Sequence, residues 1–267
     1  MKSRITITIS RDILGKIDLL IDKKSIRNRS HAIEYLIIKT LKPYISKAII
    51  LAGGSRNGSL IAPTRKIAGI SLIETTIDLL IKSGVKIIVI RGGKNLSKIK
   101  SILSGKFRQV SLIYVDEKRP LGTASAIKES QQYINQESFL VIHGDILTNI
   151  NLLDFIKFHE QEQTLSTIAV KPRIAEKKYG KVLLQGNKIS RYIGEKEKKG
   201  ISIVNAGIYC FKPEIFDVIS SNNYTSLEES VFPEIAKVGE LSAFLFQGIW
   251  CDISSLKDYK LALDRLK

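Results

Sequence analysis

Two carboxylates far apart in the sequence, Asp145 and Asp252, each lie at or just beyond a run of apolar residues that favours a β-strand. Side chains at the carboxyl ends of strands in an open α/β sheet point into the crevice where ligands bind. A third apolar run ends in the glycine pair Gly53 and Gly54, whose backbone can approach a phosphate closely because it lacks Cβ atoms. Carboxylate oxygens suit Mg²⁺, which in turn neutralises a nucleotide's phosphates. The chemistry that these residues predict is phosphate transfer.

The part of the chain from Lys47 onward alternates between strand and helix patterns. The apolar periodicity predicts strands at 48–52, 86–90, 112–115 and 138–143, and helices at 72–83, 96–103 and 122–129. Strands separated by helical stretches are typical of a parallel sheet with helices on both faces. We therefore expect residues 47–267 to form one α/β domain with a Rossmann-like, doubly wound sheet.

The first 46 residues have a different pattern. Residues 4–9 alternate between polar and isoleucine side chains, as a half-buried strand does, and a helical pattern follows from Ile13 to Ile21. Ser30 is a good N-cap for a second helix. A strand followed by two helices in this length resembles the ribbon-helix-helix family of DNA-binding proteins. Because a lone six-residue strand needs a partner, this unit, residues 1–46, predicts a homodimer or a higher homo-oligomer.

The resemblance to ribbon-helix-helix proteins implies DNA as a partner. The paired strands of that family enter the major groove, so the polar face of the strand would meet base edges, and the start of the second helix would hold a phosphate. The residues placed there are Arg4, Thr6, Thr8, Arg29 and Ser30. The alternative is that the segment only pairs two chains.

Composition limits the other classes of partner. The net charge of +16 is shared by both parts of the chain and favours phosphate-bearing partners, although solvated basic faces would give the same charge. No apolar run approaches the roughly 18–20 residues of a membrane span, and the first residues lack the pattern of a secretory signal. Two distant cysteines give no disulfide framework. We expect a cytoplasmic protein without a membrane partner.

Seven short motifs after Lys47 occur in the order found in sugar-phosphate nucleotidyltransferases, a GT-A-like family. They are Leu51-Ala52-Gly53-Gly54, Pro120-Leu121-Gly122-Thr123-Ala124, His143-Gly144-Asp145, Tyr179-Gly180, Glu195-Lys196, Val204-Asn205-Ala206-Gly207-Ile208-Tyr209 and Trp250-Cys251-Asp252-Ile253. A further segment, Ser226-Leu227-Glu228-Glu229, looks most like the branch that acts on mannose- and heptose-type 1-phosphates. Each motif alone is weak, but seven in order are specific.

This resemblance implies an enzyme that joins a nucleoside triphosphate to a sugar 1-phosphate and releases pyrophosphate. Asp145 and Asp252 would hold Mg²⁺. The nucleotide would lie against Leu51, Ala52, Gly53, Gly54, Glu117 and Gly122, and the sugar phosphate against Gly180, Glu195, Lys196 and Asn205.

Glu117 stands where this family contacts the edge of the base. A carboxylate can accept hydrogen bonds from both the N1–H and the exocyclic amine of guanine, whereas uracil and thymine offer one donor. We therefore expect GTP rather than UTP or dTTP. His143 precedes the turn that carries Asp145, and we expect it to pack at the end of a strand.

The Gly-rich loop departs from the family pattern. The family continues Gly-Gly-x-Gly-Thr-Arg-Leu and then Pro-Lys-Pro, whose cations neutralise the phosphates, and this chain lacks both. Arg56 could replace the loop arginine, and Arg65 or Lys66 the lysine; we take Arg56 and Lys66, with Asp145, as the catalytic candidates. Losing one such cation typically costs about 3–4 kcal/mol of transition-state stabilisation. The alternative function is a transcriptional regulator whose degenerate nucleotidyltransferase domain senses a nucleotide or nucleotide sugar.

Overall fold

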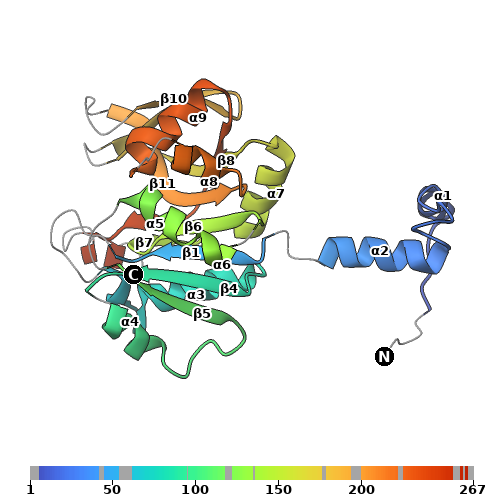
Figure 1. Cartoon of the computed structure of the whole chain (residues 1–267), viewed down its shortest axis with the longest axis horizontal. Helices are drawn as coiled ribbons and strands as arrows, with labels where there is room; N and C mark the ends of the chain where they lie inside the picture. The colour runs from blue at the N-terminus through green and yellow to red at the C-terminus, as the bar shows by residue number, and fades with distance from the viewer. Residues whose placement is uncertain are drawn as a thin grey trace. The chain divides into compact units, whose positions relative to one another are not determined.

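The computed structural model of the chain describes residues 6–41, 45–53, 62–94, 96–117, 122–134, 136–175, 179–193, 200–221, 225–254, 259–260 and 262–263. The chain divides into two compact units, Met1–Pro43 and Tyr44–Lys267. Figure 1 shows both units, coloured along the chain.

Two helices make up the N-terminal unit, α1 (Arg11–Asp18) and α2 (Arg29–Leu41), where the apolar spacing predicts helices. The prediction that Ser30 caps the second helix is wrong. This helix already begins at Arg29, and Asn28 Oδ1 accepts the backbone N–H of His31 at 2.9 Å. Asparagine and serine cap helices about equally well, so the residue that directly precedes the first turn takes the role.

The described part of the predicted strand, residues 6–9, pairs with no other strand in the single chain. Arg4 lies outside the described residues, and residues 6–9 form no strand, with Thr6 and Thr8 exposed. A strand needs a neighbour for its backbone groups, and the ribbon that was predicted takes that neighbour from a second chain. Within the described residues Ile17 and Ala32 are buried, whereas Ile7 and Ile13 are about half exposed.

A nine-stranded sheet organises the second unit, in the order β5-β4-β1-β6-β11-β8-β12-β10-β9. Its first four strands are parallel: β1 (Lys47–Leu51), β4 (Ile87–Gly92), β5 (Ser111–Asp116) and β6 (Phe139–His143). Their bounds confirm the predicted strands to within one or two residues. The helices α3 (Leu72–Lys82), α4 (Leu96–Leu103) and α5 (Thr123–Glu129) confirm the predicted helices.

The prediction of a wholly parallel sheet is wrong, because the other half of the sheet is mixed. β11 (Gly200–Phe211) runs antiparallel to β6 and to β8 (Ser166–Ala175), and β9 (Lys181–Gln185) pairs antiparallel with β10 (Lys188–Ile193). β12 (Leu241–Leu245) is parallel to β8. A parallel neighbour requires a long crossover connection. The described segments between β8 and β11 contain strands and turns but no crossover helix.

Helices cover both faces of this sheet, and β1 shows how the sequence divides between them. Ala48 and Ile50 pack into the core with α3 and α4, whereas Ile49 and Leu51 pack into the core on the opposite face. The second face is covered by α5, α6 (Gln131–Ile134), α8 (Ile215–Ser221), α9 (Phe232–Lys237) and the five-residue π-helix η2 (Leu227–Val231). Burial on both faces explains why the strand is continuously apolar.

Two small two-stranded sheets and a 3-10 turn lie outside the nine-stranded sheet. β7 (Ile146–Thr148) follows β6 and pairs antiparallel with β13 (Trp250–Asp252). A 3-10 turn, η1 (Ala62–Thr64), precedes the hairpin of β2 (Lys66–Ile67) and β3 (Ile70–Ser71). No helix in the described part of the chain is long and apolar enough to cross a membrane.

A histidine on α7 (Leu152–Glu162) is buried against β8. His159 Nδ1 lies 2.7 Å from Thr167 Oγ1 of β8, and its Nε2 has no hydrogen-bond partner among the described residues. Burial, and after it the charge of Lys212, lower the pKa of His159 to about 4. The folded protein therefore favours the neutral imidazole.

We predict that stability falls as the pH drops from about 6.5 toward about 4, because in this window the unfolded chain binds a proton that the folded chain does not. This histidine contributes up to about 3 kcal/mol of that loss. His159→Asn keeps a polar contact with Thr167 but cannot titrate, so urea unfolding at several pH values should show a shallower acid dependence. Parallel curves for the two proteins would contradict the assignment.

Candidate active site

At β1 the order of the strands reverses: the chain adds β4 and β5 on one side of β1 and later adds β6 on the other side. The predicted nucleotide residues Leu51, Ala52 and Gly53 occupy the carboxyl end of β1. Leu51 O accepts the Gly144 N–H at 2.8 Å, and Ala52 N–H donates to Arg91 O at 2.7 Å, which fixes the segment to both neighbours. Such a switch point opens a crevice in α/β sheets.

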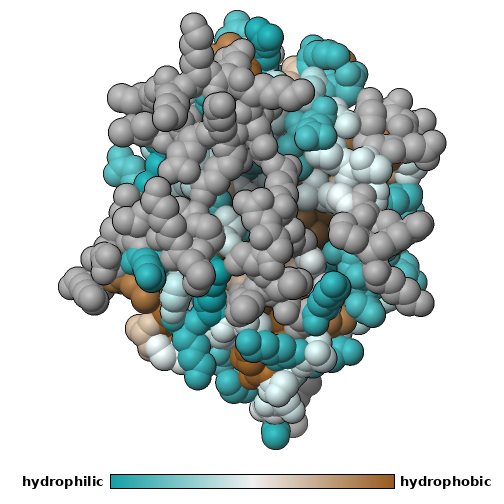
Figure 2. All heavy atoms as spheres, turned by 90° about the vertical axis from the view of Figure 1, so that its left-hand side faces the viewer, coloured by the Kyte–Doolittle hydropathy of each residue, from teal (hydrophilic) through white to brown (hydrophobic). Residues whose placement is uncertain are grey.

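The carboxyl ends of β1 and β6 lie toward the left of Figure 1. Figure 2 turns this side toward the viewer, and the described side chains there are largely hydrophilic, with smaller hydrophobic areas between them.

Glu117 lies directly against Gly53. It follows β5, and its backbone N–H donates to Gly92 O at 2.8 Å. A Cβ atom at position 53 would overlap Glu117 Oε2, so only glycine leaves this carboxylate in its place. The structure thus brings these two predicted nucleotide residues together at the crevice.

Gly122, the residue before α5, needs glycine for two reasons. Its φ of 87° and ψ of 163° lie in a region that residues with a Cβ rarely adopt. A Cβ atom there would also overlap the carbonyl oxygen of Thr225, which accepts the Ala124 N–H at 2.9 Å. The loop that carries Gly122 therefore packs tightly against the segment leading into η2.

Asp145 and Asp252 come together through the pairing of β7 with β13. Asp252 lies opposite Ile146, and Ile253 N–H donates to Asp145 O at 2.9 Å. Both carboxylates are partly exposed, and Asp252 Oδ1 accepts the backbone N–H of Ser254 at 2.9 Å. Carboxylates offer the hard oxygen ligands that Mg²⁺ takes together with substrate phosphates, so the types of residue present at this pairing fit that ion.

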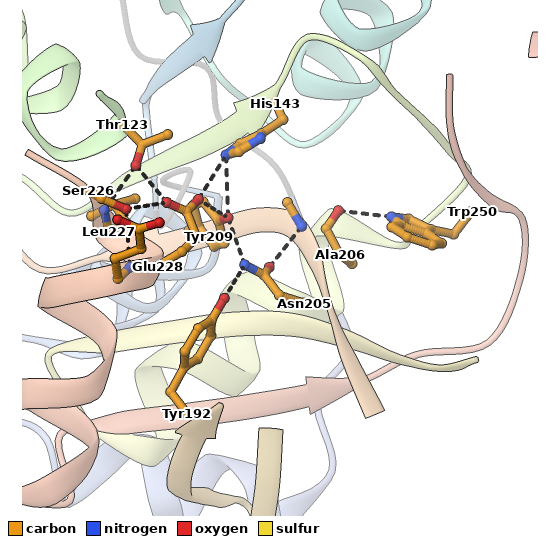
Figure 3. A network of polar contacts seen from close by, with 12 residues as sticks. Thr123, His143, Tyr192, Asn205, Ala206, Tyr209, Ser226, Leu227, Glu228 and Trp250 are labelled. Atoms are coloured by element: carbon orange, nitrogen blue, oxygen red, sulfur yellow. Dashed lines mark hydrogen bonds and ion pairs between the residues drawn. The ribbon is translucent and has the colours of Figure 1, made fainter. Parts of the chain in front are cut away.

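Trp250 ties this pair of strands to the segment that carries Asn205. Its side chain is buried, as its expected packing role requires, and its Nε1–H donates to Ala206 O at 2.8 Å (Figure 3). Trp250, two residues before the predicted metal ligand Asp252, is therefore hydrogen-bonded to the residue that follows Asn205, which is predicted to orient the sugar.

Arg65, rather than Lys66, reaches the residue that follows Asp252. The Arg65 side chain is buried, donates through Nη1 to Ile253 O, and lies 5.4 Å from the centre of the Tyr259 ring. Lys66 is exposed on β2. Of the two cations that the sequence offered in this segment, the geometry favours Arg65 for neutralising charge beside Asp145 and Asp252.

The predicted sugar residues Gly180 and Asn205 are also neighbours. Asn205 N–H donates to Gly180 O at 2.8 Å. The Asn205 amide nitrogen donates to the hydroxyls of Tyr209 at 2.9 Å and Tyr192 at 3.1 Å, while its oxygen accepts the Gly207 N–H at 2.9 Å. These contacts hold the amide in one orientation. The remaining candidates, Gly54, Arg56, Glu195 and Lys196, lie outside the described residues.

Polar side chains of β6, β11, α5 and the start of η2 form a network to which the motifs gave no role (Figure 3). Glu228 accepts from the Thr123 hydroxyl at 2.7 Å, and the buried Tyr209 hydroxyl lies 3.3 Å from both Glu228 Oε1 and His143 Nε2. His143 packs edge-on against the Tyr209 ring, as expected of a residue at a strand end, but its imidazole also faces Glu228 at 3.7 Å. The sequence signal for Glu228 was its place in the Ser226–Glu229 segment, to which no role was given.

Comparison with known proteins assigns a family to most of the chain. The family described as nucleotidyl transferase matches residues 47–266, most of the chain. The chain belongs to the nucleotidyl transferase family. The match begins after the N-terminal unit, so the ribbon-helix-helix resemblance of that unit remains a prediction.

Curated relatives of this nucleotidyl transferase include mannose-1-phosphate guanylyltransferases. The catalytic subunit beta from Danio rerio is 29% identical over 231 residues, which cover 80% of this chain and 62% of that protein. The probable mannose-1-phosphate guanylyltransferase 3 of Arabidopsis thaliana is 31% identical over 157 residues, covering 57% of this chain and 47% of its own. The chain thus spans less than two thirds of the length of these relatives.

Solved structures share the fold of this nucleotidyl transferase. HddC from Yersinia pseudotuberculosis has a TM-score of 0.70 at 24% identity, covering 84% of this chain and all of its own. A putative glucose-1-phosphate thymidylyltransferase from Bacillus anthracis has a TM-score of 0.73 at 19% identity, covering 82% of this chain and 94% of its own. Both confirm the mixed α/β architecture.

Proposed function

We propose that the nucleotidyl transferase unit joins a nucleoside triphosphate, with GTP preferred, to a sugar 1-phosphate, giving a nucleotide sugar and pyrophosphate. The observation that supports this proposal is the backbone pairing of β7 with β13, which brings the segments that carry Asp145 and Asp252 together. Gly53 with Glu117, and Gly180 with Asn205, supply two further groups of predicted substrate residues. The curated relatives named as mannose-1-phosphate guanylyltransferases support this substrate class.

The reaction is a displacement in which a phosphate oxygen of the sugar 1-phosphate attacks the α-phosphorus and pyrophosphate leaves. It depends on positioning and on neutralising charge rather than on covalent help from the protein. Asp145 and Asp252 would hold Mg²⁺, which would supply Lewis acidity and a template for the phosphates. Arg65 adds a fixed positive charge beside these carboxylates, Asn205 orients the sugar, and Glu117 accepts hydrogen bonds from the base.

We predict that Asp145→Asn lowers pyrophosphate release from GTP, Mg²⁺ and mannose 1-phosphate by at least about 100-fold, because it removes charge from the metal site. A continuous pyrophosphate assay measures this effect. Asp78→Asn is the control, since it changes an exposed carboxylate on α3. Equal rates for the two variants would refute the metal assignment, and a wild-type protein inactive with every nucleotide and sugar phosphate would refute the enzyme.

The preference for guanine depends on the charge of Glu117. Glu117→Gln places an amide N–H₂ against a base edge that consists of donors, so we predict that kcat/KM for GTP falls about 10- to 100-fold, while that for UTP changes less. Asp116→Asn, an exposed neighbour at the end of β5, should leave both values unchanged. Faster use of UTP than GTP by the wild type, with every sugar phosphate tried, would rule out the preference.

For the N-terminal unit we infer pairing with a second copy of the chain. A unit of this size rarely buries enough apolar surface alone, and the half-exposed Ile7 and Ile13 support a missing partner. Paired strands would present Thr6 and Thr8, with Arg4, to the base edges of DNA. Arg29 already forms a bidentate ion pair with Asp18, from Nε to Oδ1 at 2.7 Å and from Nη2 to Oδ2 at 2.8 Å. A DNA phosphate would therefore have to compete with that carboxylate.

We predict that Ile7→Glu converts dimers into monomers in sedimentation equilibrium, because it would bury a charge between the paired strands. Leu19→Glu, at an apolar residue that is 86% exposed outside the strand, should remain dimeric. Retention of specific DNA should be lost with the dimer. If DNA of every sequence is retained and released by modest salt, the unit contributes only its charge.

A further inference from the structure

Glu228 is the common acceptor of several hydroxyl groups at the border of the crevice (Figure 3). The hydroxyl of Thr123 donates to Oε2 at 2.7 Å and that of Ser226 at 3.2 Å. The Tyr209 hydroxyl donates to Oε1 at 3.3 Å. Within the described residues, the His143 imidazole lies 3.7 Å from this carboxylate, and no lysine or arginine nitrogen lies within 4 Å.

Backbone and amide donors fix the direction of these hydrogen bonds. Leu227 N–H donates to Thr123 Oγ1 at 2.9 Å, and Glu229 N–H donates to Ser226 Oγ at 3.1 Å, so each hydroxyl turns its own proton toward Glu228. The Asn205 amide likewise donates to the Tyr209 oxygen at 2.9 Å. Burial, and after it the charge of Glu228, raise the pKa of Tyr209 well above its usual value, so the phenol keeps the proton that it donates.

A carboxylate with these three donors can accept a further hydrogen bond. An ionised carboxylate has about four lone-pair positions, and its neighbours fill three. The Oε1 contact with Tyr209 is long, and the Glu228 side chain is 17% exposed. The remaining lone pair can therefore accept a hydrogen bond only from a ligand group that carries a proton.

The position of Glu228 indicates which ligand supplies that proton. Thr123 follows Gly122, the proposed nucleotide residue, and His143 precedes Asp145 by two positions in β6 and its turn. Asn205, which orients Tyr209, is bonded through its backbone to Gly180, the proposed sugar residue. The carboxylate is thus bonded through Tyr209 to the proposed sugar residues and through Thr123 to the nucleotide loop.

We propose that Glu228 accepts a hydrogen bond from a ring hydroxyl of the sugar 1-phosphate and so selects the sugar. This inference rests on the proposed function, because it names a contact within the same site. A site built to bond a substrate hydroxyl strongly rejects an analogue that lacks it, because a buried acceptor is then left without a donor. The same hydrogen bonds would also hold η2 in place if Glu228 were only structural, so the experiment must separate the two roles.

The test combines a variant with substrate analogues. Glu228→Gln keeps the size of the side chain and removes its charge, while Glu229→Gln changes the exposed carboxylate next to it on η2. Pyrophosphate release is measured with GTP and with mannose 1-phosphate or its 2-, 3-, 4- and 6-deoxy analogues. We expect KM for mannose 1-phosphate to rise about 10- to 100-fold in Glu228→Gln, with KM for GTP unchanged and Glu229→Gln like the wild type.

One deoxy analogue should show the same KM with the wild type and with Glu228→Gln, since the contacted hydroxyl is already absent from it. A loss that is equal for all analogues, or that extends to KM for GTP, would assign Glu228 a structural role and overturn the proposal. Tyr209→Phe removes one donor to the carboxylate and should give a smaller loss for the same hydroxyl, so the test does not depend on one variant folding.

Calorimetric binding of the same sugar phosphates separates this proposal from the proposed function. Binding by the wild type without pyrophosphate release would overturn the enzyme alone, and the dependence of affinity on Glu228 and on one hydroxyl would still support the contact. Pyrophosphate release that is insensitive to Glu228→Gln would overturn the contact and leave the enzyme. Absence of binding to mannose, glucose and galactose 1-phosphates would overturn both.

Discussion

The site depends on one short antiparallel pairing between segments that are distant in the sequence. β7 and β13 place Asp252 opposite Ile146, and the Ile253 amide reaches the carbonyl of Asp145. Two carboxylates repel one another, so it is the backbone hydrogen bonds of this pairing that bring the two acidic residues together. Arg65, bonded to Ile253 O, supplies positive charge from the described residues, and the proposed Mg²⁺ would add to it.

Two glycines let polar groups approach the backbone more closely than a residue with a Cβ atom would permit. Gly53 leaves room for the Glu117 carboxylate, and Gly122 for the Thr225 carbonyl. Gly53 follows β1 by two residues and Gly122 directly precedes α5, so each close approach lies beside the end of a regular element. Preorganisation of this kind reduces the ordering that substrate binding must complete.

Local patterns in the sequence were enough to predict the parallel half of the sheet, because buried strands and helices alternate there with clear periodicity. They could not predict which strands pair, so the antiparallel β11 and the β7–β13 contact were missed. Motif order identified Asp145 and Asp252 as a pair. The preference for Arg65 over Lys66 needed the fold, because side-chain direction near a short hairpin is not encoded in spacing.

The topology of the sheet also explains how two substrates would meet. The proposed nucleotide residues belong to the parallel half: Gly53 comes after β1, Glu117 comes after β5, and Gly122 comes before α5. The proposed sugar residues Gly180 and Asn205 belong to the mixed half, which is joined to the first by the pairing of β6 with β11. Asp145 follows β6, the last parallel strand. The proposed metal ligands therefore stand at the border between the halves, where the attacking phosphate and the α-phosphorus have to come together.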